Sequence, residues 1–197
     1  MSETLIALVT LAFTAAWTPG PNNALVATSG ANFGFLRSLP HVLGITLGFP
    51  LMIFIVGLFL GELFQQAPIL REILRWGGAA LLLYIAWKIA FSGGLGSKEG
   101  RGRPFTFVEA AAFQWVNPKG WAMAIAVTSQ FVTPENPIKT ALMVSAVFTL
   151  AGLTSASSWA LAGRALTRWI NTDNRLRWFN ITMAVLIAAT VVLLFLD

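Results

Sequence analysis

The sequence predicts an all-α polytopic membrane protein whose six transmembrane helices form two inverted three-helix repeats. Only 11% of the 197 residues are charged and 56% are hydrophobic, whereas a soluble domain carries about 25% charged residues. The apolar residues form six long runs, each close to the length of about 20 residues with which a helix crosses a bilayer. Prolines interrupt the first and the fourth run, so we expect helices 1 and 4 to be broken.

The predicted spans can be placed along the chain in order. They cover residues 4–28, 40–61, 69–91, 105–132, 138–162 and 178–196. The breaks fall at residues 18–21 and 117–118. No basic segment precedes the first run, so we interpret it as a membrane helix and not as a signal peptide. The length fits one membrane domain over residues 1–197.

Basic residues predict the orientation of the chain. Nine Lys and Arg residues fall in the connections after spans one, three and five, against three after spans two and four. Cytoplasmic loops carry an excess of Lys and Arg, so we expect both termini to face the periplasm of a bacterial inner membrane. The net charge of +5 follows from this bias, and we expect no nucleic-acid partner.

A basic, Gly-rich segment at residues 93–104 has the composition of a flexible linker. It divides the chain into halves of about residues 1–92 and 105–197, and each half opens with a broken helix. Three spans per half is an odd number, so the halves must insert in opposite directions. Inverted repeats of this kind are common in transporters, which bind their substrates where the broken helices meet.

The residue types at the two breaks predict helix starts inside the membrane. Thr18 precedes Pro19, and Asn117 precedes Pro118, which is the pattern of an N-cap followed by proline at the first helical position. Each start would present free N–H groups and a partial positive charge that attract an anion. Lys119 adds a full charge beside the second break. Its partner is either a substrate carboxylate or water reached by snorkelling.

Two motifs resemble the lysine exporter (LysE/RhtB) family. The sequence TPGPNN at residues 18–23 is similar to the family's first-helix signature, and QWVNPK at residues 114–119 is similar to its fourth-helix signature. Residues 77–88 are similar to the third-helix pattern. The resemblance covers nearly the whole chain in order and length. It implies a secondary transporter that exports amino acids or related small metabolites, driven by the proton gradient.

The resemblance also narrows the expected substrate. The sequence is closest to the family branch that exports cysteine, O-acetylserine and other small neutral amino acids. Family members that export lysine or arginine carry an Asp in the second helix, whereas residues 44–48 hold no acid. We therefore expect a neutral amino acid. The predicted substrate-binding residues are Thr18, Pro19, Gly20, Pro21, Asn22, Asn23, Gln114, Asn117, Pro118 and Lys119.

Proton coupling requires a titratable group on the transport pathway. The candidates are Glu109, His41 and Glu62, of which Glu109 is preferred. Each lies near a predicted helix end, so solvation at the membrane interface is the alternative interpretation. The chain has no Cys and one His, and we expect no metal site. It contains no Walker A loop, nucleophile elbow or His-Glu-x-x-His motif, so we expect no enzyme activity and no cofactor.

Two other functions stay open from sequence alone. Broken helices could be purely structural in a non-transporting membrane scaffold or assembly subunit, and a passive metabolite channel could share the architecture. Efflux of radiolabelled amino acids would distinguish an exporter from a scaffold, and dependence on the proton gradient would distinguish it from a channel. Because six helices make a small transporter, a homodimer in the lipid bilayer is also considered.

Overall fold

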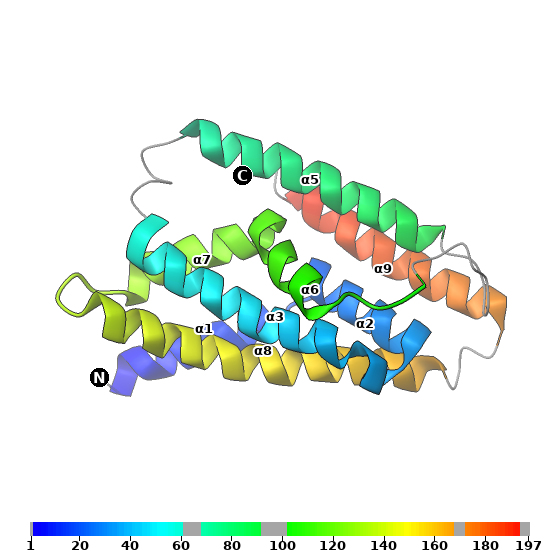
Figure 1. The fold of residues 1–197 in the computed structure, drawn as a ribbon, viewed down its shortest axis with the longest axis horizontal. Helices are drawn as coiled ribbons and strands as arrows, with labels where there is room; N and C mark the ends of the chain where they lie inside the picture. Colours follow the sequence, from blue (N-terminus) through cyan, green and yellow to red (C-terminus); the bar gives the residue numbers. More distant parts are fainter. Residues whose placement is uncertain (1, 61–67, 92–101, 168–171, 194–197) are drawn as a thin grey trace.

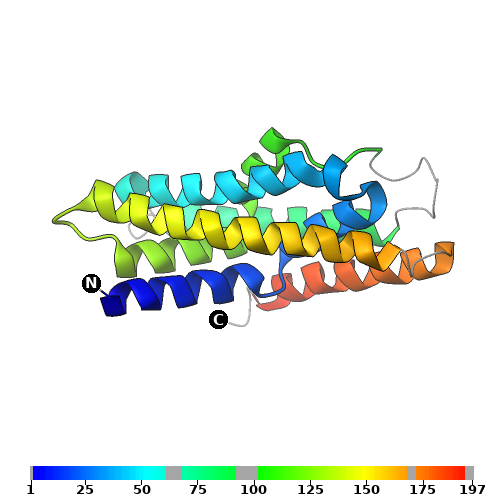
Figure 2. The ribbon, with the colours of Figure 1, turned by 90° about the horizontal axis from the view of Figure 1, so that it is seen from below.

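The computed structural model describes residues 2–60, 68–91, 102–167 and 172–193, and these form a bundle of helices. The α-helices are α1 (Ser2–Trp17), α2 (Pro21–Phe33), α3 (Phe35–Ile55), α5 (Pro68–Ala90), α6 (Phe107–Phe113), α7 (Pro118–Phe131), α8 (Pro137–Thr167) and α9 (Asp173–Leu193). A π-helical turn, η1 (Val56–Leu60), continues α3, and a 3₁₀ turn, η2 (Gln114–Val116), follows α6. Most of the helices run along the long axis of the molecule (Figures 1 and 2).

The lengths and composition of these helices confirm a multi-pass membrane protein. Within the described residues, three helices are long and apolar enough to cross a bilayer, namely Phe35–Phe59, Pro137–Leu166 and Asn174–Val192. The bent pair of α1 and α2 makes a fourth candidate span. The helix α5 coincides with the predicted third span, and α6, η2 and α7 together coincide with the predicted fourth. The count of six spans and the inverted repeat stay predictions.

The connection between the first two spans is much shorter than predicted. The predicted spans leave residues 29–39 as a connection, but α2 continues to Phe33 and α3 begins at Phe35. Gly34 makes the turn alone, with a φ of 80°, a backbone conformation that glycine adopts without steric cost. Arg37 therefore lies in the first turn of α3. Most of the predicted linker at residues 93–104 lies outside the described residues.

Large apolar side chains cover the outside of the bundle. Exposed examples on α3 and α5 are Leu36, Leu43, Leu47, Leu51, Ile73, Trp76, Leu83 and Trp87. On α3 they are separated by seven, four and four residues and so follow one face of the helix. Soluble proteins rarely expose contiguous apolar patches larger than a few hundred Å², so this surface fits contact with lipid.

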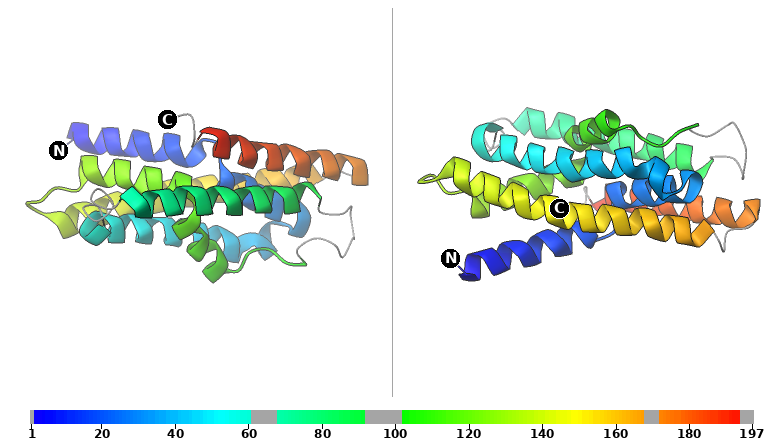
Figure 3. Two further views of the ribbon diagram at one scale, coloured as in Figure 1. Left: turned by 90° about the horizontal axis from the view of Figure 1, so that it is seen from above. Right: turned by 60° about the horizontal axis from the view of Figure 1, so that its bottom comes forward.

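The helix α8 lies at the centre of the packing, in contact with α1, α2 and α3. It approaches α2 most closely where a side chain on Gly30 would collide with the Ala160 carbonyl, and one on Gly163 with the Ala27 carbonyl. Beside this group, α5 packs against α9, and α9 also contacts α2 (Figure 3). The close contact fixes the position of α2, which carries three of the ten predicted site residues.

Basic residues gather toward one end of the bundle. The α2–α3 turn, the end of α5, the end of α8 and the start of α9 lie at this end, and the N-terminus lies at the other (Figures 1 and 3). These segments carry Arg37, Lys88, Arg164 and Arg175. The distribution agrees with the positive-inside pattern from which the orientation was predicted.

Candidate functional site

The first break separates α1 from α2, which meet at an angle of 53°. The helix α2 begins at Pro21 with Gly20 as its N-cap, so the prediction that Thr18 is the N-cap is wrong. The Thr18 hydroxyl donates a hydrogen bond to the Thr14 carbonyl at 2.6 Å. Threonine hydroxyls often bond back to the carbonyl one turn earlier, and Thr18 therefore belongs to the end of α1.

Side chains satisfy the carbonyl groups that the end of α1 leaves without helical partners. The Asn23 amide donates to the carbonyls of Ala16 at 2.9 Å and Thr18 at 3.0 Å. The Ser155 hydroxyl on α8 donates to the Ala16 carbonyl at 2.7 Å. Unpaired carbonyls are costly where water is scarce. Asn23 and Ser155 therefore stabilise the first break.

The second break separates η2 from α7. Asn117 is the N-cap and Pro118 follows in the first turn, as the sequence predicts. The Asn117 side chain makes no capping hydrogen bond. It is only 2% exposed, and its Oδ1 accepts no hydrogen bond from the described residues. A buried polar atom without a partner costs about 1–3 kcal/mol, so this oxygen is a candidate ligand-binding group.

The two breaks meet in the middle of the bundle. Lys119 Nζ donates to the carbonyls of Thr18 at 3.2 Å and Pro19 at 3.4 Å. The side-chain amides of Asn22 and Gln114 donate to each other, at 2.8 and 3.2 Å. Segments from opposite halves of the chain therefore form one polar cluster.

Lys119 has protein partners at the first break. Its amine binds carbonyls at the end of α1, where the helix dipole is negative, and the side chain is half-buried. A Cβ on Gly20 would lie 2.9 Å from Lys119 Nζ, so the glycine makes room for this approach. An ammonium group has three N–H donors. With two donors directed at carbonyls, a third can bind a ligand.

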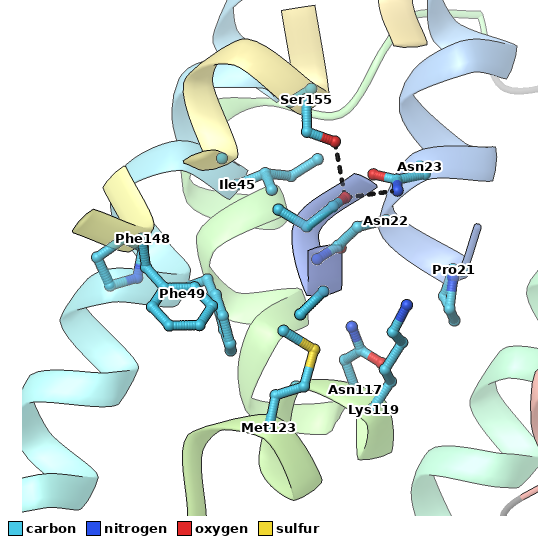
Figure 4. Close-up of a pocket in the computed structure, with 17 residues that line it drawn as sticks. Pro21, Asn22, Asn23, Ile45, Phe49, Asn117, Lys119, Met123, Phe148 and Ser155 are labelled. Carbon is cyan, nitrogen blue, oxygen red and sulfur yellow. Dashed lines mark hydrogen bonds between the residues drawn. The ribbon is translucent and has the colours of Figure 1, made fainter. Parts of the chain in front are cut away.

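A cavity of about 60 Å³ lies at this junction (Figure 4). By the usual criterion of about 10–15 Å³ per water molecule, it has room for roughly four waters. Six predicted site residues line it, namely Gly20, Pro21, Asn22, Asn23, Asn117 and Lys119. Of the other four, Thr18, Pro19 and Gln114 hydrogen-bond to lining residues, and Pro118 begins α7.

The remaining wall of the cavity was not predicted. It includes Ile45 and Phe49 on α3, Met123 on α7, and Phe148 and Gly152 on α8. These residues lie in apolar spans and resemble any other packing residue, so composition and spacing give no signal for them. Ser155 also lines the cavity.

The coupling candidate His41 is buried, contrary to the alternative that it is solvated at the membrane interface. It is only 2% exposed. Its Nδ1 lies 2.8 Å from the Ser29 hydroxyl on α2, and its ring packs against Phe105 with a centroid distance of 5.0 Å. His41 therefore links α3 to the half-helix that carries Asn22.

The other candidates have different surroundings. Glu109 forms a capping box with Thr106 at the start of α6. It also accepts two hydrogen bonds from Arg103, at 2.7 and 3.0 Å. Glu109 raises the pKa of Arg103, mainly through these hydrogen bonds and secondly through its negative charge. Glu62 lies outside the described residues. In the part of the chain that the structure describes, no group of three His, Cys, Asp or Glu side chains could hold a metal ion.

A bundle of apolar helices, with two breaks that meet at a small cavity, has the architecture of a membrane transporter. The LysE type translocator family matches residues 13–197, and the chain belongs to this family. The cysteine/O-acetylserine efflux protein of Escherichia coli (strain K12) is 32% identical over 199 residues, which cover 99% of this chain and 100% of the relative. The protein of the same name from Shigella flexneri serotype 5b (strain 8401) is 31% identical over 194 residues, 97% of each chain. No solved structure matches the chain.

Proposed function

We propose that the protein is a secondary transporter that exports neutral amino acids from the cytoplasm. The observation that carries this proposal is the meeting of two broken helices around Lys119 and Asn117 at one cavity. Relatives that match the chain over its whole length are named for the efflux of cysteine and O-acetylserine, which supports the substrate class. The proposed role is transport and not enzymatic catalysis.

The site offers complementary groups for a carboxylate. The helices α2 and α7 each begin at a break. The N–H groups of their first turns have no partner in their own helix, and the helix dipole is positive there. Lys119 Nζ lies between these turns and the carbonyls of Thr18 and Pro19. We assign the substrate carboxylate to Lys119 and these two helix starts, because all three favour negative charge.

The substrate ammonium group needs an acceptor, and Asn117 supplies one. Its buried Oδ1 has no hydrogen-bond partner among the described residues. An ammonium donates and cannot accept hydrogen bonds, so it suits an isolated carbonyl oxygen. Among the residues that the structure describes, no acidic side chain lines the cavity, which favours a substrate without a second positive charge.

Transport is proposed to occur by rocking of the two halves, residues 1–92 and 105–197, around the fixed site. The pairs α3–α8 and α5–α9, which pack together, would each join equivalent helices of the inverted repeat. The location proposed is the bacterial inner membrane, with both termini periplasmic. A homodimer is a further prediction that the single chain does not test.

Proton coupling is part of the proposal, and His41 is its best-supported residue. The ring is buried between α3 and α2, with Nδ1 in contact with the Ser29 hydroxyl, and a protonated ring donates hydrogen bonds from both of its nitrogens. Among the described residues, the charged side chains on α2, α3, α6 and α8 are Arg37, Glu109, Lys139 and Arg164, and none of them is buried. Replacement by Gln should preserve a hydrogen bond to Ser29 and make export insensitive to the proton gradient. Export that still follows the gradient would exclude His41.

The exporter proposal is tested by efflux of radiolabelled amino acids from cells that produce equal amounts of each variant. Lys119→Ala and Asn22→Ala are expected to lose export while they still insert into the membrane. Lys139→Ala on α8 and Asn32→Ala on α2 replace exposed residues and are matched controls that should export normally. Full export by both site variants would refute the site. Absence of export by the wild type would favour a scaffold, and export indifferent to a protonophore would favour a channel.

A further inference from the structure

The cavity has two chemically different ends. Gly20, Asn22, Asn117 and Lys119 bring polar groups from the breaks to one end, and the opposite wall is apolar. Figure 4 shows Phe49 and Phe148 across the cavity from Asn117 and Lys119. Since Lys119 is the one charged residue among the lining residues, the apolar end has no counter-charge.

The apolar end is built from three helices. Phe49 and Phe148 pack edge to face, with ring centroids 5.7 Å apart and planes at 76°. Ile45 lies one turn before Phe49 on α3, and Met123 adds a thioether from α7. The wall beside Phe148 is open at Gly152, where an added Cβ would have only the Thr46 Cα within 4 Å, at 3.7 Å.

We infer that Ile45, Phe49, Met123 and Phe148 form the subsite for the substrate's side chain and limit its charge and length. The inference rests on the proposed binding of the carboxylate at Lys119. With the carboxylate held there, the substrate's Cα lies at the boundary between the two ends, and its side chain points toward the aromatic pair. A charged side chain in this position would be buried without a partner, at a cost of several kcal/mol.

The geometry also sets the preferred length of the side chain. Met123 lies one helical turn beyond Lys119 on α7, which corresponds to about 6 Å along the axis. The cavity between them is small, at about 60 Å³, and therefore favours a short side chain. Short aliphatic and sulfur-containing side chains fit this chemistry, because thioether and thiol groups pack favourably against aromatic rings. Aromatic amino acids are too long while Phe148 is present.

The test measures efflux of individual amino acids from proteoliposomes that contain the purified full-length protein. The panel comprises alanine, cysteine, methionine, phenylalanine, lysine and glutamate. Wild type should export the short neutral members and exclude lysine and glutamate. Phe148→Ala removes a ring of six carbons and should raise the ratio of phenylalanine to alanine export by at least about tenfold, the lower end of the discrimination that a single methylene gives in a hydrophobic pocket. Leu150→Ala, which shortens a lipid-exposed residue on the same helix, is the matched control and should leave the ratio unchanged.

A ratio measured within one preparation does not depend on how much protein folds. Phe148→Leu provides a milder variant if Phe148→Ala does not accumulate. A ratio within twofold of wild type in both variants would overturn the subsite. Wild-type export of lysine or glutamate at the rate of alanine would also overturn it, although the exporter proposal would stand. Absence of any amino-acid export by the wild type would overturn both.

Discussion

The two helix breaks use similar residues for different purposes. At the first, Asn23 and Ser155 donate to the Ala16 carbonyl, and Asn23 and Lys119 donate to the Thr18 carbonyl. At the second, the N-cap residue Asn117 is buried and its Oδ1 accepts no bond from the described residues. Internal hydrogen bonds thus satisfy the first break, whereas at the second break the Asn117 Oδ1 acceptor has no partner among the described residues.

The half-helices that follow the breaks differ in the same way. A side chain on Gly30 of α2 would collide with the Ala160 carbonyl, so α2 is held tightly against α8. Gly120, in the first turn of α7, has more space around it, because an added Cβ would lie 3.3 Å from the Gln114 carbonyl oxygen. The tight packing against α8 therefore holds α2 in place, and both half-helices carry residues of the proposed site.

The largest expected effect comes from filling the contact between α2 and α8. Gly30→Ala would force the two helices apart and should destabilise the protein by about 3 kcal/mol, the upper range for overpacked sites. Gly120→Ala is the matched variant and should cost clearly less. The measurement is the thermal unfolding midpoint in detergent together with the amount of protein in the membrane. Equal losses in the two variants would contradict the difference between the half-helices.

The next largest effect is expected when the hydrogen bonds from Asn23 to the end of α1 are removed. Asn23→Leu preserves the approximate size of the side chain but removes two hydrogen bonds, each worth about 1 kcal/mol. We expect the unfolding midpoint to fall accordingly. Asn32→Leu removes an exposed amide on the same helix that bonds only one turn back, and it should have little effect. A midpoint for the Asn23 variant that matches this control would show that the bonds do not stabilise the break.

At the second break the expected effect is on transport and not on stability. Asn117→Leu removes a buried oxygen without a partner, so the unfolding midpoint should stay equal or rise. Loss of a hydrogen bond to a charged ammonium should raise the substrate concentration for half-maximal export at least about tenfold. The measurement is efflux as a function of internal amino-acid concentration. Unchanged export, or a large loss of stability, would place Asn117 with the structural residues.

The smallest effect is expected at Glu109. Its carboxylate is bound to Arg103 at the surface and to the first turn of α6, and exposed ion pairs contribute little to stability. Glu109→Gln retains part of the capping box. Its rate of export and dependence on the proton gradient should match the wild type. A loss of gradient dependence would restore Glu109 as the coupling residue in place of His41.

Both breaks lie where the prolines predict them, but the predicted N-cap is correct only at the second. Asn117 and Pro118 follow the usual order of an N-cap and a first-turn proline, and α7 begins there. Thr18 and Pro19 show the same order, but Pro21 begins the helix two residues later. Two prolines close together allow two helix starts, and the hydrogen bond from Thr18 back to Thr14 selects the later one.

Contacts between distant segments were harder to predict. The carbonyls that bind Lys119 are backbone groups, and any residue type could supply them. The apolar wall around Phe148 carries no polar residue to mark it, and the burial of His41 depends on the one-residue turn at Gly34. The sequence could predict which helices break, because proline and its neighbours act locally, but not which groups meet across the bundle.

The central claim is that the breaks hold a carboxylate at Lys119. The most direct test is an equilibrium binding measurement with purified protein and two ligands. One ligand is the amino acid that the wild type exports fastest, and the other is the amine formed from it by decarboxylation. We predict that the wild type binds the amino acid and not the amine, and that Lys119→Met lowers the affinity for the amino acid at least about tenfold, as expected for one charge-assisted contact. Equal binding of the two ligands by the wild type, or full affinity for the amino acid in Lys119→Met, would contradict this account.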